Sequence, residues 1–202
     1  MNTISKWLTV LALLSGPPWA HATVFQGQDA NGAFDNSCMV SGVSACVMYY
    51  DSNLNIEILN NWNIGAGTWS GVQTLAEAAG FTATGLTGWV LPTESGNVSA
   101  GASNQYLSIW QDVGSSLSGL QAQFAGVQNF YYWSGTEFSP ALGAWYFGTG
   151  DGFQNVGGEF NDYYAVAVRP GEVSDVPLPA AVWLLLSGLG SLGAMVRKRK
   201  SN

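Results

Sequence analysis

The sequence Phe130-Tyr131-Tyr132-Trp133-Ser134 opens the part of the chain that decides the fold. It is the first of three aromatic or β-branched runs, at residues 130–134, 144–147 and 163–168. Gly-, Asn- and Asp-rich loops of hairpin length separate these runs, which favours antiparallel strands. Alternate residues of a strand face opposite sides, so Tyr131 and Trp133 should share one face while Tyr132 takes the other.

Upstream of these runs the sequence predicts two more short strands. Residues 26–45 are rich in Gly, Asn, Ser and Asp and predict an irregular loop. The β-prone run 45–50 is expected to form a strand that a turn ends. Apolar and polar residues then alternate from Leu54 to Ile58, which predicts a half-buried second strand.

The middle of the chain predicts two helices. The first has one apolar face at i, i+3, i+4 and i+7, formed by Val72, Leu75, Ala76 and Ala79. Ser70 can cap it and Gly80 can end it. A short strand is expected at 89–91 and a second helix at 104–113, whereas 115–125 fits either helix or loop. Strands, then helices, then strands predict an α+β domain with an antiparallel sheet.

The charges narrow the possible functions. The chain has 202 residues, of which 9% are charged. Residues 23–175 hold all 13 acids and one base, Arg169, for a net charge of −12, and contain no Lys or His. This excludes nucleic-acid binding, which needs cations. It also excludes a Ser-His-Asp triad, a Schiff-base lysine and a His-ligated zinc site.

The N-terminus, residues 1–22, has the three parts of a secretory signal peptide in order. Lys6 is the positive residue, an apolar run covers 7–14, and Ala20-His21-Ala22 is an A-x-A site. Cleavage between Ala22 and Thr23 is therefore expected. A buried N-terminal helix is the alternative.

The C-terminus, residues 176–202, combines three features. Val176-Pro177-Leu178-Pro179 leads into an apolar run over 180–196, and a basic cluster over 197–200 follows. Such a run just spans the hydrocarbon of a bilayer, and the basic cluster would stay on the cytoplasmic side. A simple tail anchor is one interpretation. The segment also resembles the PEP-CTERM family of sorting signals, which implies export, transient membrane anchoring and processing by an exosortase near the proline motif.

Cys38 and Cys46 are the two cysteines of the chain. Export brings them into an oxidising compartment, where they can pair. Two reduced, buried cysteines remain the alternative. No metal ligand set is assigned, although acid-rich loops can hold Ca²⁺.

The aromatic residues of the last third point to a sugar-binding surface. Rings stack on sugar C–H faces, and carboxylates or amides accept hydroxyl protons. The candidate residues combine rings and acceptors near strand ends: Trp133, Glu137, Trp145, Asp151 and Asn155. Trp89 and Trp133 are also expected to be mostly buried, because each lies in an apolar strand.

Carboxylates offer a rival interpretation, since paired acids hydrolyse glycosidic bonds without His or Lys. The candidates lie in the loops of the last third: Glu137, Asp151, Glu159 and Asp162.

Four motifs in this order resemble the Lcl C-terminal-domain family: YDSNLNI at 50–56, GWVLPT at 88–93, YWSGTE at 132–137 and AVAVRPG at 165–171. The resemblance covers residues 46–173 and implies a C-type-lectin-like fold, and for some members of the family it implies adhesion and binding of sulfated glycans. The family has Arg where this chain has Val90, which leaves Arg169 as the only cation of the domain. Arg169 is expected to pair with a carboxylate.

Together these features predict an exported, non-enzymatic protein of the cell surface or polysaccharide matrix. A net charge of −12 argues against polyanionic ligands, so a neutral polysaccharide is the expected partner. A carboxylate-based glycoside hydrolase and a purely structural matrix protein are the alternatives.

Overall fold

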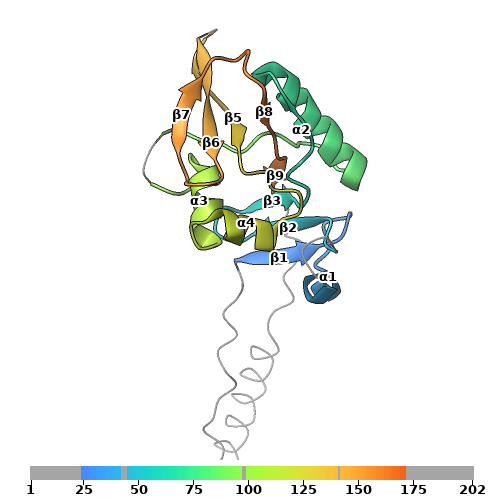
Figure 1. Cartoon of the computed structure of the whole chain (residues 1–202). Helices are drawn as coiled ribbons and strands as arrows, with labels where there is room; N and C mark the ends of the chain where they lie inside the picture. Colours follow the sequence, from blue (N-terminus) through green and yellow to red (C-terminus); the bar gives the residue numbers. More distant parts are fainter. Residues whose placement is uncertain (1–23, 42–44, 97–98, 141, 172–202) are drawn as a thin grey trace, which may run out of the picture.

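The computed structural model describes residues 24–41, 45–96, 99–140 and 142–171. They form an α+β structure with two sheets, which confirms the predicted α+β class (Figure 1). The expected signal peptide and C-terminal apolar helix lie outside these residues. Within them, no helix is both long and apolar enough to cross a membrane.

Most strands lie at the two ends of the described domain, and three helices follow one another in its middle. The strands are β1 (Phe25–Gln28), β2 (Met48–Asp51), β3 (Ile56–Leu59), β4 (Ala66–Gly67), β5 (Tyr131–Ser139), β6 (Gly143–Gly148), β7 (Gln154–Gly157), β8 (Tyr163–Tyr164) and β9 (Val168–Pro170). The helices are α1 (Asn36–Ser41), α2 (Trp69–Thr84), α3 (Gln105–Asp112) and α4 (Leu117–Gln123).

The first sheet has the order β1-β2-β3-β9, and all its pairs are antiparallel. The prediction that β3 is half-buried is wrong, because all four of its residues are buried. β3 lies between β2 and β9, and Glu57 faces Arg169 across the β3–β9 pair. An acid that pairs with a base inside the protein produces the same alternation in sequence as an acid that faces water.

The second sheet has the order β4-β8-β5-β6-β7. Its pairs are antiparallel except for β5 and β8, which pair in parallel at Tyr132 and Tyr164. The run 163–168, expected as one strand, belongs to both sheets. β8 lies in the second sheet and β9 in the first, and fully buried residues join them. Strand β7 was not predicted, because its sequence Q-N-V-G contains only one apolar residue.

Helix α2 continues past Gly80, which was expected to end it, and stops at Gly85, where φ is 73°. Gly80 serves packing instead: a Cβ at this position would overlap the indole ring of Trp89. Thr68, not Ser70, occupies the N-cap position. The segment 89–91 forms no regular strand but a single bridge, in which Val90 pairs with Val168.

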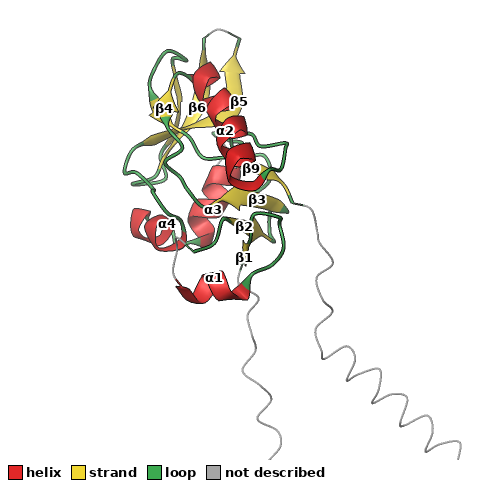
Figure 2. Ribbon diagram, turned by 90° about the vertical axis from the view of Figure 1, so that its right-hand side faces the viewer, coloured by secondary structure: helices red, strands yellow, loops and turns green. Residues whose placement is uncertain are grey.

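The second predicted helix is confirmed as α3, and its N-cap Asn104 accepts a hydrogen bond from the backbone N–H of Leu107 at 3.3 Å. The segment 115–125, which fitted either helix or loop, contains the helix α4, whereas α1 was not predicted (Figure 2). Helix α1 and strand β1 replace much of the irregular loop expected at 26–45. Their residues are mostly polar or small, so the sequence shows neither the apolar spacing of a helix nor the alternation of a strand clearly.

Cys38 and Cys46 form a disulfide, which ties α1 to the residues before β2. Both ends of the described domain meet the turn between β2 and β3. The carbonyl of Val24 accepts from the N–H of Ser52 at 3.1 Å, and the N–H of Gly171 donates to the carbonyl of Asn55 at 2.9 Å. The second sheet therefore lies away from the point where the chain leaves the domain (Figure 1).

Candidate functional site

Five aromatic side chains form a continuous surface on one face of the second sheet: Phe130, Tyr131, Tyr146, Phe153 and Tyr163. We call it the aromatic platform. Its ring centroids lie between 4.8 Å (Tyr131 to Tyr146) and 6.4 Å (Tyr146 to Phe153) apart. Phe130 is 47% exposed and Phe153 is 45% exposed. Solvent therefore reaches the platform at both of these rings.

The strand register explains why these rings meet. Trp133 on β5 lies opposite Tyr146 on β6, which lies opposite Asn155 on β7. Tyr131, two residues before Trp133, shares that face, whereas Tyr132 points into the core, as the alternation predicted. The platform thus combines residues from separate strands, which only the pairing brings together.

Trp133 lies beside the platform rings on the same face and is fully buried, as is expected for an apolar strand. Its ring packs 4.5 Å from that of Tyr163, and its Nε1 donates to the carbonyl of Gly67 at 3.0 Å. Trp133 therefore supports the platform from the core. It is no longer a candidate for direct ligand contact.

Polar side chains surround the platform. Asn155 forms a side-chain hydrogen bond with Tyr146, and Asn161 donates to the hydroxyl of Tyr163 at 3.4 Å. Burial raises the pKa values of both tyrosines above their usual value of 10.0, so the phenols stay neutral at physiological pH. Neutral phenols and amides can both donate and accept hydrogen bonds.

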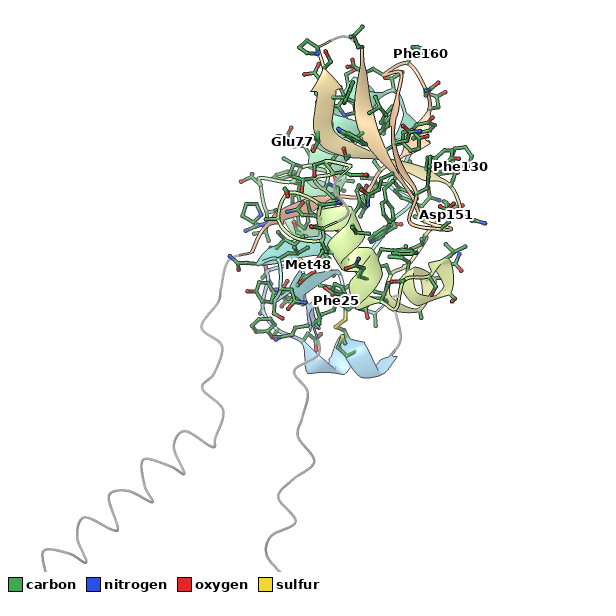
Figure 3. All side chains as sticks on the ribbon, turned by 90° about the vertical axis from the view of Figure 1, so that its left-hand side faces the viewer. Phe25, Met48, Glu77, Phe130, Asp151 and Phe160 are labelled. Carbon is green, nitrogen blue, oxygen red and sulfur yellow. A yellow bond between two sulfur atoms is a disulfide. The ribbon has the colours of Figure 1, made fainter. Side chains whose placement is uncertain are left out.

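A depression of about 270 Å³ lies at the Phe130 end of the platform; its lining is Asn129, Phe130, Tyr131, Gly148, Gly150 and Asp151. Figure 3 shows Phe130 and Asp151 next to each other on this side of the molecule. One oxygen of Asp151 accepts from the backbone N–H of Phe153 at 3.0 Å. At Gly150 a Cβ would lie 2.7 Å from the side-chain oxygen of Asn129, so glycine keeps the depression open.

The predicted site residues do not form one cluster. Asp151 and Asn155 lie at the platform, whereas Glu137 and Trp145 do not. Glu137 lies opposite Ala144 in the β5–β6 pair. Ala144 is four residues, or roughly 13 Å along the strand, from Gly148 at the end of β6. Trp145 alternates with Tyr146, so it faces the other side of β6, where it packs 5.8 Å from Phe138.

The carboxylates considered for glycoside hydrolysis are also separated in the structure. Glu137 and Asp151 lie toward opposite ends of the β5–β6 hairpin, whereas a catalytic pair lies roughly 5 to 10 Å apart. One carboxylate oxygen of Glu159 is buried, and Asp162 is exposed. Among the residues that the structure describes, no three His, Cys, Asp or Glu side chains lie close enough to hold a metal ion.

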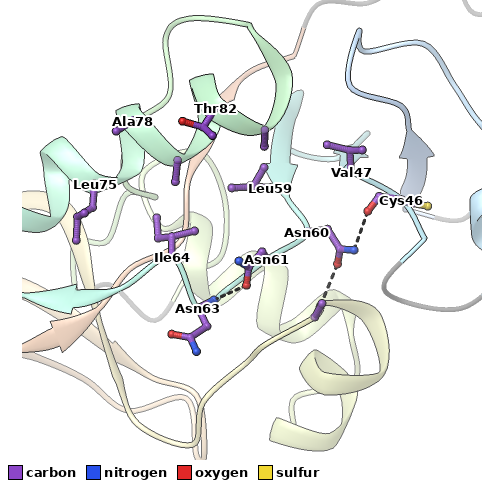
Figure 4. A pocket seen from close by; sticks show the side chains of 13 residues that line it. Cys46, Val47, Leu59, Asn60, Asn61, Asn63, Ile64, Leu75, Ala78 and Thr82 are labelled. Carbon is purple, nitrogen blue, oxygen red and sulfur yellow. Dashed lines mark hydrogen bonds between the residues drawn. The ribbon is translucent and has the colours of Figure 1, made fainter.

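A wider groove, of about 610 Å³, lies between α2 and residues 59–64 (Figure 4). Its lining is mainly aliphatic. The side-chain amide of Asn60 donates to the carbonyl of Cys46 at 2.8 Å and accepts from the N–H of Ala125 at 3.0 Å. The side chain of Asn61 accepts from the N–H of Asn63 at 3.0 Å. The groove lacks the exposed rings of the platform, which makes the platform the better candidate for a sugar.

None of the five platform rings was among the predicted site residues. The signal was present, because the aromatic residues crowd into the last third and alternate along β5. The missing information was the pairing of β5 with β6 and β8, which depends on tertiary structure.

Comparison with known families identifies one segment. Residues 175–200 match the PEP-CTERM protein-sorting motif. No curated protein matches the chain. The motif lies outside the described residues and indicates an exported protein that an exosortase processes and that reaches the cell envelope or surface.

Proposed function

We propose that this exported, exosortase-sorted protein binds a neutral polysaccharide through the aromatic platform. The observation that carries the proposal is the row of rings around the buried Tyr146, in which Phe130 and Phe153 are exposed and Tyr131 and Tyr163 are partly exposed, with neutral hydrogen-bonding groups beside them. Sugar rings present C–H faces that stack on aromatic side chains, and their hydroxyls pair with amides, phenols and carboxylates. Asp151, Asn155 and Asn161 supply such partners here.

The charge of the domain supports a neutral ligand. Arg169 is the only Lys, Arg or His in the described ranges, and it is buried against Glu57. No cation of these ranges therefore faces a ligand, and an anionic polysaccharide would meet a negative surface. A neutral chain is bound without this repulsion.

The resemblance of residues 46–173 to a known family is a further argument for binding. Likeness to the Lcl C-terminal-domain family, and through it to C-type-lectin-like folds, favours adhesion over catalysis. A glycoside hydrolase needs two carboxylates that flank the bound sugar, and Asp151 is the one acid that lines the depression. We therefore propose a binding protein that is not an enzyme.

The proposal is tested by applying the full chain, in neutral detergent, to an array of neutral and anionic glycans. Parallel arrays with Ca²⁺ and with a chelator measure any calcium requirement, because acidic loops can hold Ca²⁺. We expect binding to neutral glycans only. Release of reducing sugar from a bound glycan would favour the hydrolase, and no binding to any glycan would favour a purely structural matrix protein.

A further inference from the structure

Glu94 is a completely buried carboxyl group at the end of the segment that follows Trp89. Neither of its side-chain oxygens has a hydrogen-bond partner in the described ranges. A buried carboxylate without a partner is strongly disfavoured relative to the neutral acid. Accordingly, burial raises the pKa of Glu94 from 4.5 to about 9.

Among the described residues, two tyrosines are the titratable groups that interact electrostatically with Glu94. They are Tyr106 of α3 and Tyr146 of β6, and burial raises the pKa of each phenol above 10.0. On β5 the neighbour is the neutral hydroxyl of Thr136, which accepts from the backbone N–H of Glu94 at 3.1 Å. The neutral tyrosines offer no positive charge, so an ionised Glu94 would gain no ion pair from them.

The residues around Glu94 are fixed to the second sheet and to α3. The carbonyl of Pro92 accepts from the N–H of Gly135 at 2.8 Å, and the carbonyl of Thr93 accepts from the N–H of Gln105 at 3.0 Å. Gly96 then lies against the ring of Trp145, where a Cβ would overlap the indole. The segment from Thr93 to Gly96 therefore covers part of Trp145, and Glu94 lies in its middle.

We propose that Glu94 is a pH-sensitive latch that holds the segment from Thr93 to Gly96 over Trp145. As a neutral acid, Glu94 stays in the core. When the carboxyl loses its proton to water, the anion has to reach solvent, which pulls the segment away and exposes Trp145. The latch depends on the burial of Glu94 and on the contact between Gly96 and Trp145, and it is independent of glycan binding.

The test follows tryptophan emission of the full chain in neutral detergent from about pH 6 to about pH 10. We expect a red shift with a midpoint near pH 9 in the native protein. The shift should be absent in Glu94→Gln, which cannot ionise, and much reduced in Trp145→Phe, which removes the reporter. Glu94→Met, similar in volume and apolar, provides a second variant without the charge.

Hydrogen exchange at matched pH gives an independent measurement. At alkaline pH the backbone amides of residues 94–96 should exchange faster in the native protein than in Glu94→Gln. The proposal is overturned if the native protein shows no transition below the pH at which its tyrosines ionise. It is also overturned if Glu94→Gln and Glu94→Met show the same transition as the native protein.

Discussion

The Nε atom of Arg169 lies 3.0 Å from Oε2 of Glu57, and both side chains are almost completely buried. The pair joins β3 to β9, the last strand before the chain leaves the domain toward the sorting motif. The guanidinium also lies 6.0 Å from the centre of the Trp89 ring. The expectation that Arg169 pairs with a domain carboxylate is therefore confirmed.

Arg169→Ala should destabilise the domain by about 3–5 kcal/mol, because it leaves the carboxylate of Glu57 buried without its cation. Thermal unfolding measures the change. The double variant Arg169→Met with Glu57→Gln removes both charges and should be more stable than Arg169→Ala. An unchanged melting temperature for Arg169→Ala would contradict this account.

The stability of the domain should fall as pH rises from about 4.5 to about 9. In this range folded Glu94 keeps its proton while unfolded Glu94 has lost it, so the unfolded state binds fewer protons. One such group changes the free energy of unfolding by at most about 1.4 kcal/mol per pH unit. Denaturant unfolding at several pH values measures the slope.

Glu94→Gln should remove most of this dependence of the free energy of unfolding on pH. A smaller slope of the same sign should remain, because the pKa of Asp51 is raised as well, chiefly by burial. Equal slopes in the native protein and the variant would show that Glu94 is ionised or exposed in the folded state.

Gly80→Ala should lower the melting temperature, although alanine favours a helix interior by about 1 kcal/mol over glycine. The added methyl group would overlap the ring of Trp89, which is 2% exposed and packs directly on this glycine. Gly71→Ala is the matched control, since Gly71 lies on the exposed side of the same helix. A stabilising Gly80→Ala would mean that Trp89 does not pack there.

These residues show what the sequence could and could not predict. Helix α3, the aromatic strands β5 and β6, and the burial of Trp89 and Trp133 follow from local pattern and apolar composition. Gly80 could not be assigned from pattern, because a glycine that ends a helix and one that admits a tryptophan look alike in sequence.

The candidate site was only partly predictable for a similar reason. Asp151 and Asn155 were selected as acceptors near strand ends, and the register of β6 and β7 places them beside the platform. The same rule selected Glu137 and Trp145, which the pairing places elsewhere. Strand register and the choice of the buried face depend on contacts between distant segments, which a single sequence does not specify.

The mature protein should begin at Thr23 and should lack the basic residues 197–200. The sequence places a signal-peptidase site before Thr23, and the PEP-CTERM motif at 175–200 indicates exosortase processing. Intact-mass measurement of the protein recovered from the cell envelope or matrix tests both cuts. A mass that retains residues 197–200 would favour a plain tail anchor.

The central claim is that the aromatic platform binds a neutral polysaccharide, and two exposed phenylalanines provide its most direct test. Phe153 belongs to the platform and is 45% exposed, whereas Phe160 is 82% exposed and makes no ring contact with the platform among the described residues. Titration calorimetry of the full chain with a neutral glycan identified on the array should show binding about tenfold weaker or worse in Phe153→Ala, and unchanged in Phe160→Ala. Native affinity in Phe153→Ala, or an equal loss in both variants, would contradict the account.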